Sequence, residues 1–175
     1  MASTAGNSDL AKTTNRWRIH KFGGTSLAEA KCFQRVKSII STCGTESVAV
    51  VCSAMGGRPK VTDLLLSACR LAAMGESQVE SYQEIIEQIR NKHIACAEAI
   101  LSPEGAEELI DTIDQDISQI QDILRAVSLM RFEFEPISEL VSGYGELWST
   151  QVRSLSSSPA PQPAHDCHPT AAFDR

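Results

Sequence analysis

The first third of the chain alternates between short apolar runs and amphipathic stretches. Residues 17–22 alternate in the manner of a strand, with Trp17, Ile19 and Lys21 on one face. Residues 47–53 form a short and almost continuous apolar run, which is typical of a strand buried on both faces of a parallel sheet. Each run is followed by a helical pattern, so the order strand, helix, strand, helix predicts an α/β fold with a right-handed crossover.

Both of these helices have recognisable ends. Ser26 and Glu29 have the spacing of a capping box, so the first helix is predicted to begin at Ser26 and to end at Gly44. The second helix is predicted to end at Gly75. Their apolar stripes consist of Leu27, Ala30, Phe33, Val36 and Ile40 in the first helix, and Val61, Leu64, Leu65, Ala68 and Leu71 in the second.

From residue 77 onward the pattern becomes entirely helical. Apolar residues recur every three or four positions over 77–101, and Ser102-Pro103 has the residue types of an N-cap and a first helical position. From Ala106 to Val127 the spacing alternates strictly between four and three. Two long helices with a short turn predict an antiparallel hairpin over about 77–130. A coiled-coil surface for a partner is the alternative.

A further helix is predicted after Pro136, through the segment SELVSGYGELWSTQV. Gly143 and Gly145 each cost such a helix about 1 kcal/mol relative to alanine, so we expect its backbone to approach another element or a ligand closely. From Ser154 the apolar pattern ends, and proline and serine accumulate. The expected organisation is therefore a flexible leader over 1–16, a folded part over 17–152 and a disordered tail over 153–175.

Composition narrows the class of protein. The chain is 42% hydrophobic and 22% charged, which is ordinary for a soluble globular protein. Its net charge of −6 gives no attraction to nucleic acid, and no apolar run reaches the length of a membrane span. We therefore expect no nucleic-acid partner, no membrane partner and a cytoplasmic location. A plastid is the alternative, because the leader is rich in serine and threonine.

The six cysteines include no C-x-x-C pair, and five of them fall within apolar helix or strand patterns. Reduced, core-filling thiols are therefore expected. Cys167 lies between His165 and His168, but three such residues bind a metal only when a rigid scaffold holds them. Chance clustering in a flexible tail is the preferred interpretation, and no metal ligand is assigned.

Two glycine-containing segments follow the predicted strands. Residues 21–26 comprise a strand end, a glycine turn and a helix start, whose N–H groups can bind an anion with Lys21 beside it. A purely structural turn is the alternative, since neither a Walker A loop nor a G-x-G-x-x-G pattern is present. Residues 53–63 follow the second strand at the same sheet edge, where such loops form a ligand crevice. Thr62 could instead be only an N-cap.

A third candidate segment, Gly143 to Ser149, contains an acidic residue among glycines and apolar residues. A lone carboxylate there is costly unless something pairs with Glu146. The amino group of a substrate would serve as that partner. A buried structural ion pair is the alternative.

Together, KFGGTSL at 21–27, SAMGG and KVTDLL between 53 and 65, and SGYGELWS at 142–149 resemble the aspartate kinases. The resemblance covers residues 17 to about 152, and the GELWS form with the helical hairpin is similar to the bifunctional aspartate kinase–homoserine dehydrogenases. It implies the N-terminal part of an amino acid kinase-type αβα sandwich with an inserted hairpin. The implied reaction is transfer of the γ-phosphate of ATP to L-aspartate with Mg²⁺, the first step towards the aspartate-family amino acids. A homo-oligomer is implied for the complete enzyme.

By the same resemblance, Lys21 is the catalytic cation that contacts the transferring phosphoryl group. Gly23, Gly24, Thr25 and Ser26 would bind the nucleotide phosphates beside it, and Ser53, Thr62 and Glu146 would form the aspartate pocket, with Glu146 facing the substrate ammonium. The loop 55–60 is longer than in some members of the family.

Residues after Val152 resemble no part of the family that we can place. From this we expect an incomplete and inactive kinase domain. Another amino acid kinase is the alternative with the same fold. A non-catalytic interaction module built on the hairpin, or an inert product of a truncated reading frame, is the alternative of a different class.

Overall fold

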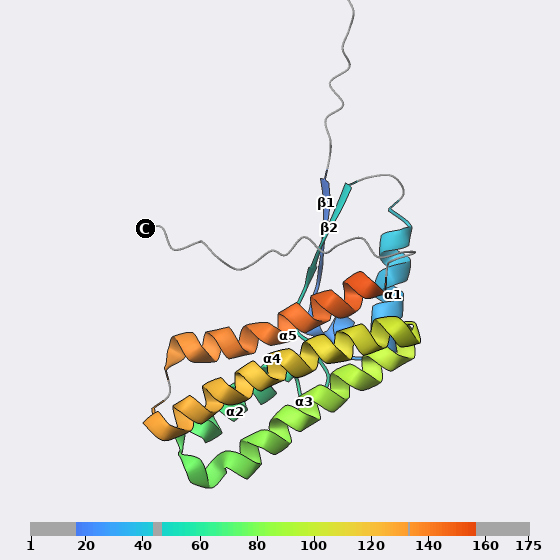
Figure 1. Ribbon diagram of the computed structural model, residues 1–175. Helices are drawn as coiled ribbons and strands as arrows, with labels where there is room; N and C mark the ends of the chain where they lie inside the picture. Colours follow the sequence, from blue (N-terminus) through green and yellow to red (C-terminus); the bar gives the residue numbers. More distant parts are fainter. Residues whose placement is uncertain (1–16, 44–46, 133, 157–175) are drawn as a thin grey trace, which may run out of the picture.

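The computed structural model describes residues 17–43, 47–132 and 134–156. Figure 1 shows a small sheet and helix α1 at one end of a layer of long helices. The elements in chain order are strand β1 (Trp17–Phe22), a 3₁₀ turn (Gly24–Leu27), helix α1 (Ala30–Ser41), strand β2 (Ser47–Cys52), helix α2 (Val61–Ala73), a second 3₁₀ turn (Glu76–Gln78), and helices α3 (Val79–Ile100), α4 (Pro103–Met130) and α5 (Glu135–Leu155).

Strands β1 and β2 pair in parallel, from Trp17 opposite Ser47 to Phe22 opposite Cys52. This pairing confirms the predicted α/β class and brings the two carboxyl ends to one edge. The prediction that β2 is buried on both faces is wrong for the described part of the chain, because Val51 is 48% exposed. On the same face Ile19 is 70% exposed, since the described helices cover only the opposite face.

The first helix begins later than the sequence predicts. Gly24–Leu27 forms a 3₁₀ turn in which the Ser26 N–H donates to the Gly23 carbonyl at 2.8 Å. Helix α1 starts only at Ala30, and its N-cap residue Glu29 makes no side-chain capping bond. The predicted capping box is therefore wrong, although the predicted stripe is confirmed by the buried side chains of Leu27, Phe33 and Val36. Gly44, the predicted helix stop, lies outside the described residues.

Helix α2 begins at Val61, and its N-cap residue is Lys60 without a side-chain capping bond. Thr62 lies inside the first turn, so the alternative interpretation of Thr62 as a helix cap is wrong. The helix ends at Ala73, and Gly75 follows with φ of 106°, a left-handed backbone conformation that favours glycine.

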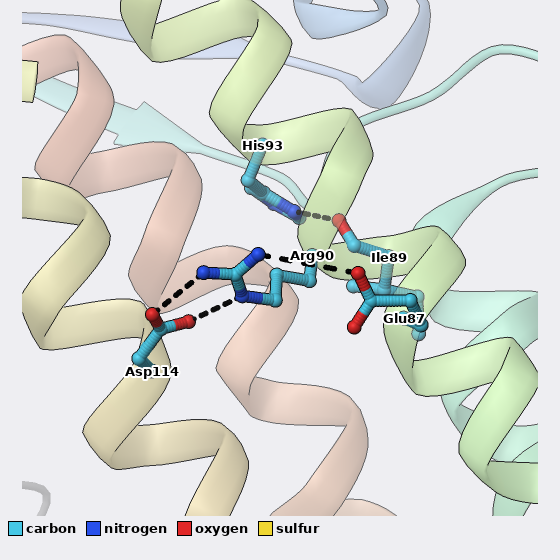
Figure 2. Close-up of polar contacts among 5 residues, drawn as sticks. All are labelled: Glu87, Ile89, Arg90, His93 and Asp114. Carbon is cyan, nitrogen blue, oxygen red and sulfur yellow. Dashed lines mark hydrogen bonds and ion pairs between the residues drawn. The ribbon is translucent and has the colours of Figure 1, made fainter.

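The predicted hairpin is confirmed by α3 and α4. Ser102 Oγ accepts a hydrogen bond from the Gly105 N–H at 3.2 Å, and Pro103 is the first residue of α4. The apolar stripes of both helices are buried, against each other and against α2. The apolar seam is therefore buried by packing within the fold, whereas the coiled-coil alternative required it to be free for a partner. The Arg90 guanidinium of α3 donates two hydrogen bonds to the Asp114 carboxylate of α4, at 2.6 and 2.7 Å. Figure 2 shows this paired contact.

Helix α5 packs on α2 and α4, with Val141, Trp148 and Val152 buried. It continues to Leu155, three residues into the segment predicted as a tail. The predicted leader and the residues from 157 onward lie outside the described residues, and so do Cys167 and its neighbouring histidines. The five cysteines in the described part are free thiols. None of the helices that the structure describes combines the length and the apolar character of a membrane span.

Candidate active site

The loops that follow β1 and β2 join at the carboxyl edge of the sheet. The Ser53 N–H donates to the Phe22 carbonyl at 3.0 Å, and the Gly56 N–H donates to the Gly24 carbonyl at 3.0 Å. A Cβ on Gly56 would overlap the carbonyl of Gly24, so the two backbones approach as closely as only glycine permits. The two glycine-containing segments therefore form a single unit, as their position after parallel strands predicts.

A cavity of about 620 Å³ opens at this unit. It is lined by Gly24, Thr25, Ser53, Ala54, Met55, Gly56, Gly57, Arg58, Lys60, Thr62 and Glu146. Five residues that the sequence marks as site candidates are thus brought together from three separate segments: Gly24, Thr25, Ser53, Thr62 and Glu146.

The other three candidates lie close by but do not line this cavity. Lys21 is exposed near the end of β1, where it pairs with Val51, and Gly23 and Ser26 are exposed in the following turn. The basic side chains that do line the cavity are Arg58 and Lys60. They were not among the residues predicted from the sequence, although two basic residues in a glycine-containing loop after a strand were a usable signal.

Glu146 reaches the cavity because α5 packs closely on the loop and on α2. A Cβ on Gly145 would lie 2.8 Å from the Ala54 Cβ and 3.0 Å from Val61 Cγ1, so only glycine allows this approach. Glu146 itself is exposed, and no ion pair among the described residues involves it. The alternative of a buried structural ion pair is therefore wrong.

Trp148 fixes this turn of α5 on the hairpin. Its side chain is fully buried, and its Nε1–H donates to Asp116 Oδ2 of α4 at 2.8 Å. The His93 and Trp148 rings pack in a T-shaped arrangement with a centroid distance of 5.0 Å. Tyr144, one turn earlier, donates from its hydroxyl to Gln119 Oε1 at 3.3 Å. Burial raises the pKa of Asp116, and the hydrogen bond from Trp148 opposes that shift.

His93 is a neutral imidazole in this packing. Figure 2 shows its ring turned towards the carbonyl of Ile89, to which Nδ1–H donates at 2.8 Å. Burial, as the largest cause, lowers the pKa of His93 to about 4. A buried cation beside an indole would lack both water and a counter-charge, so the neutral form is the stable one.

Lys92 of α3 contacts the loop that follows β2, and the sequence did not indicate this contact. Its ammonium donates to the carbonyl oxygens of Gly56 and Pro59, the second at 3.0 Å. Burial lowers the pKa of Lys92. In the sequence this lysine belongs to the polar face of a helix, where solvation is the default, and only the tertiary structure shows that the face meets a loop.

The charged side chains that line the cavity suit the binding of a zwitterion, or of an anion alone. Arg58 and Lys60 provide positive charge, and Glu146 is the only acidic side chain among the lining residues. Within the described residues no three histidine, cysteine, aspartate or glutamate side chains form a metal-binding group. These residues therefore do not fit a directly coordinated Mg²⁺ ion.

A family model described as the amino acid kinase family matches residues 16–174. The chain belongs to the amino acid kinase family. This assignment confirms the family and the fold that the sequence motifs indicate.

The curated relatives that the chain matches include aspartokinases and bifunctional aspartokinase/homoserine dehydrogenases. The chain is 32% identical to bifunctional aspartokinase/homoserine dehydrogenase 1, chloroplastic, of Zea mays over 85% of its own length, and it spans 15% of that relative. It is 33% identical to the Saccharomyces cerevisiae aspartokinase over 75% of its own length and spans 26% of that enzyme. The chain thus corresponds to a minor part of each of these relatives.

Solved structures of Escherichia coli aspartokinase III share the fold. The complex with lysine and aspartate matches with a TM-score of 0.64 and 25% identity, over 79% of this chain and 28% of that one. The complex with aspartate and ADP matches with a TM-score of 0.62 and 26% identity over the same shares.

Proposed function

We propose that this chain provides the aspartate-binding and phosphate-binding part of an aspartate kinase. In the proposed reaction, an oxygen of the aspartate side-chain carboxylate bonds to the γ-phosphorus of ATP, and the bond from that phosphorus to the β-phosphate oxygen breaks. The products are ADP and 4-phospho-L-aspartate. The observation that carries the proposal is the joining of Glu146, Ser53 and Thr62 with the glycine turn in one cavity. The aspartokinase names of the relatives support it.

The roles of the individual residues follow from charge and position. Glu146 is proposed to accept hydrogen bonds from the substrate ammonium, with Ser53 and Thr62 in the same pocket. Gly23, Gly24, Thr25 and Ser26 are proposed to lie along the nucleotide phosphates, because a glycine turn lets anionic oxygens approach the main chain. Lys21 is proposed to neutralise the transferring phosphoryl group, since catalysis of this transfer is mainly positioning and charge stabilisation.

Mg²⁺ is proposed to arrive with ATP rather than to be held by this part of the chain. Mg²⁺ commonly keeps several waters and binds through substrate phosphates with one or two carboxylates. The cavity has a single lining carboxylate, which we assign to the amino-acid substrate, so its lining leaves no carboxylate for the ion. The ion would draw electron density from the β- and γ-phosphate oxygens.

The biological setting is likewise a proposal. We place the reaction at the start of aspartate-family amino-acid biosynthesis, in a cytoplasmic enzyme that forms a homo-oligomer when complete. The chloroplastic names of the plant relatives favour a plastid as the second candidate compartment. Imaging a fluorescent fusion of the chain in its native cells would separate the two.

The test measures aspartate binding by calorimetry in the 175-residue chain. Binding is the better measure than turnover, because in-line transfer requires both substrates and Mg²⁺ held together, and we do not expect these residues alone to achieve it. Glu146→Gln keeps the shape and removes the charge. Aspartate binding should weaken by about 1.5–3 kcal/mol, the usual range for a hydrogen bond to a charged group.

Two controls make this test specific. Glu139→Gln removes an exposed carboxylate from the same helix, away from the cavity, and should leave aspartate binding unchanged. Succinate lacks the ammonium group, so Glu146→Gln should not weaken its binding. Equal aspartate affinity in the wild type and a folded Glu146→Gln variant would remove the proposed role of Glu146.

A further inference from the structure

The loop over residues 53–60 forms one wall of the cavity and is held by α3. Lys92 Nζ donates to the carbonyls of Gly56 and Pro59, which lie on either side of Gly57 and Arg58. Gly56, Gly57, Arg58 and Lys60 line the cavity, whereas Lys92 does not. Lys92 therefore holds the loop without being one of the residues that line the cavity.

The direction of these two carbonyls fixes the direction of two N–H groups. In a trans peptide the C=O and N–H bonds point in opposite directions. The peptides that join Gly56 to Gly57 and Pro59 to Lys60 are trans, since Arg58-Pro59 is the cis peptide in the described part of the chain. With both carbonyls turned towards the Lys92 ammonium, the N–H groups of Gly57 and Lys60 point away from it, and both residues line the cavity.

These two N–H groups remain available as donors. The neighbouring Gly56 and Val61 N–H groups donate to the carbonyls of Gly24 and Met55 at 3.0 Å each. Among the described residues, no backbone carbonyl accepts from the N–H of Gly57 or of Lys60. Available N–H groups in a concave loop bind anions, and the side chains of Arg58 and Lys60 add positive charge to the same wall.

We propose that Lys92 is a positioning residue that shapes loop 56–60 into a binding site for a phosphate group, through the N–H groups of Gly57 and Lys60. Lys92 acts from behind the loop by holding its carbonyls away from the anion, which they would otherwise repel. The inference deepens the proposed function and rests on it for the source of the phosphate, a nucleotide. Its chemical content, a polyphosphate site dependent on Lys92, is testable without turnover.

The experiment follows the ¹H–¹⁵N signals of the 175-residue chain during titration with tripolyphosphate, at constant ionic strength set with chloride. The Gly57 and Lys60 amides of the wild type should shift and saturate. Lys92→Met removes the donors at similar length, and its affinity for tripolyphosphate should fall by about tenfold, the loss expected for a charged hydrogen bond. Lys92→Arg restores the donors and should bind within about threefold of the wild type.

Arg90→Met is the matched control, because it removes a cation and an ion pair from the same helix at a position that faces Asp114. It should leave tripolyphosphate affinity unchanged, whereas a purely structural effect of losing a cation would weaken both variants alike. Absence of shifts at Gly57 and Lys60 in the wild type overturns the inference, and so does wild-type affinity in Lys92→Met. If Lys92→Met fails to fold, the inference is still tested by the amide shifts of the wild type and by the tripolyphosphate affinity of Lys92→Arg.

The two proposals fail separately. Tripolyphosphate binding that depends on Lys92, without aspartate binding that depends on Glu146, keeps this inference and removes the proposed acceptor. Aspartate binding that depends on Glu146, with tripolyphosphate binding indifferent to Lys92, keeps the proposed function and removes this inference.

Discussion

Gly143 and Gly145 lie two residues apart in α5, and their surroundings differ. A Cβ at position 145 would meet Ala54 and Val61 at 3.0 Å or less, whereas a Cβ at 143 would meet nothing within 4 Å. The sequence predicts close approach at both glycines, and the structure shows it only at Gly145. Spacing along a helix does not reveal which of two residues faces its neighbour when both lack a side chain.

Alanine substitutions at these glycines should change stability in opposite directions. Gly145→Ala should lower the free energy of unfolding by about 1–3 kcal/mol, because the added methyl group overpacks the contact between α5 and α2. Gly143→Ala should raise it by about 0.5–1 kcal/mol, the difference in helix propensity. Urea unfolding of both variants measures the two effects. Stabilisation by Gly145→Ala would show that the contact is looser than described.

At the scale of the helices, His93 joins α3 to α5 through Trp148, and its protonation is linked to folding. Its pKa is about 4 in the folded protein, below the ordinary value of 6.5. Between these values the unfolded chain binds more protons than the folded one. The contribution of the neutral imidazole to the free energy of unfolding is therefore complete above about pH 6.5. It is lost progressively as the pH falls towards 4.

Replacing His93 should flatten this pH dependence. The shift corresponds to about 3 kcal/mol of unfolding free energy between pH 7 and pH 4, at about 1.4 kcal/mol for each pH unit. His93→Gln retains a donor for the Ile89 carbonyl and does not titrate. Urea unfolding at pH 7 and pH 5 should show a smaller loss of stability in the variant than in the wild type. An equal loss in both would place the acid sensitivity elsewhere.

The long elements were predictable because their apolar positions repeat with a helical or strand period. The turn at Ser102-Pro103, the buried stripe of α4 and the two strands all follow the local pattern. The start of α1 was not predictable in this way, because Ser26 and Glu29 satisfy a local rule that the 3₁₀ turn at Gly24–Leu27 overrides. There the burial of Leu27 accompanies the tighter turn.

The candidate site shows the same division between local and tertiary information. Its glycine turns follow strands and were visible in the sequence, and Glu146 stood out as a carboxylate among apolar neighbours. Lys92 did not stand out, because its role depends on α3 passing behind a loop about 36 residues away in the sequence. Such a contact has no local pattern.

At the scale of the whole molecule, the exposed large apolar side chains of the described residues include two groups. One is the open face of the sheet, with Trp17, Ile19 and Val51. The other lies where α4 leads to α5 and includes Leu129, Met130 and Phe132. An apolar run such as β2 predicts burial, but it does not tell which face a neighbouring layer covers. For this reason the layering was less predictable than the elements.

The hydrogen bonds that hold the loops around the cavity also determine how readily these loops open locally. Its loops are held by a few long-range hydrogen bonds, among them Gly56 to Gly24 and Lys92 to the loop, whereas α4 is held by a continuous series of local ones. Local opening costs least free energy where such bonds are few. Amide hydrogen exchange should therefore be faster at Gly56 than at Ile117 in α4, and a bound anion should slow exchange at Gly56 but not at Ile117. Equal exchange rates at both would mean that the loops open only when the whole protein unfolds.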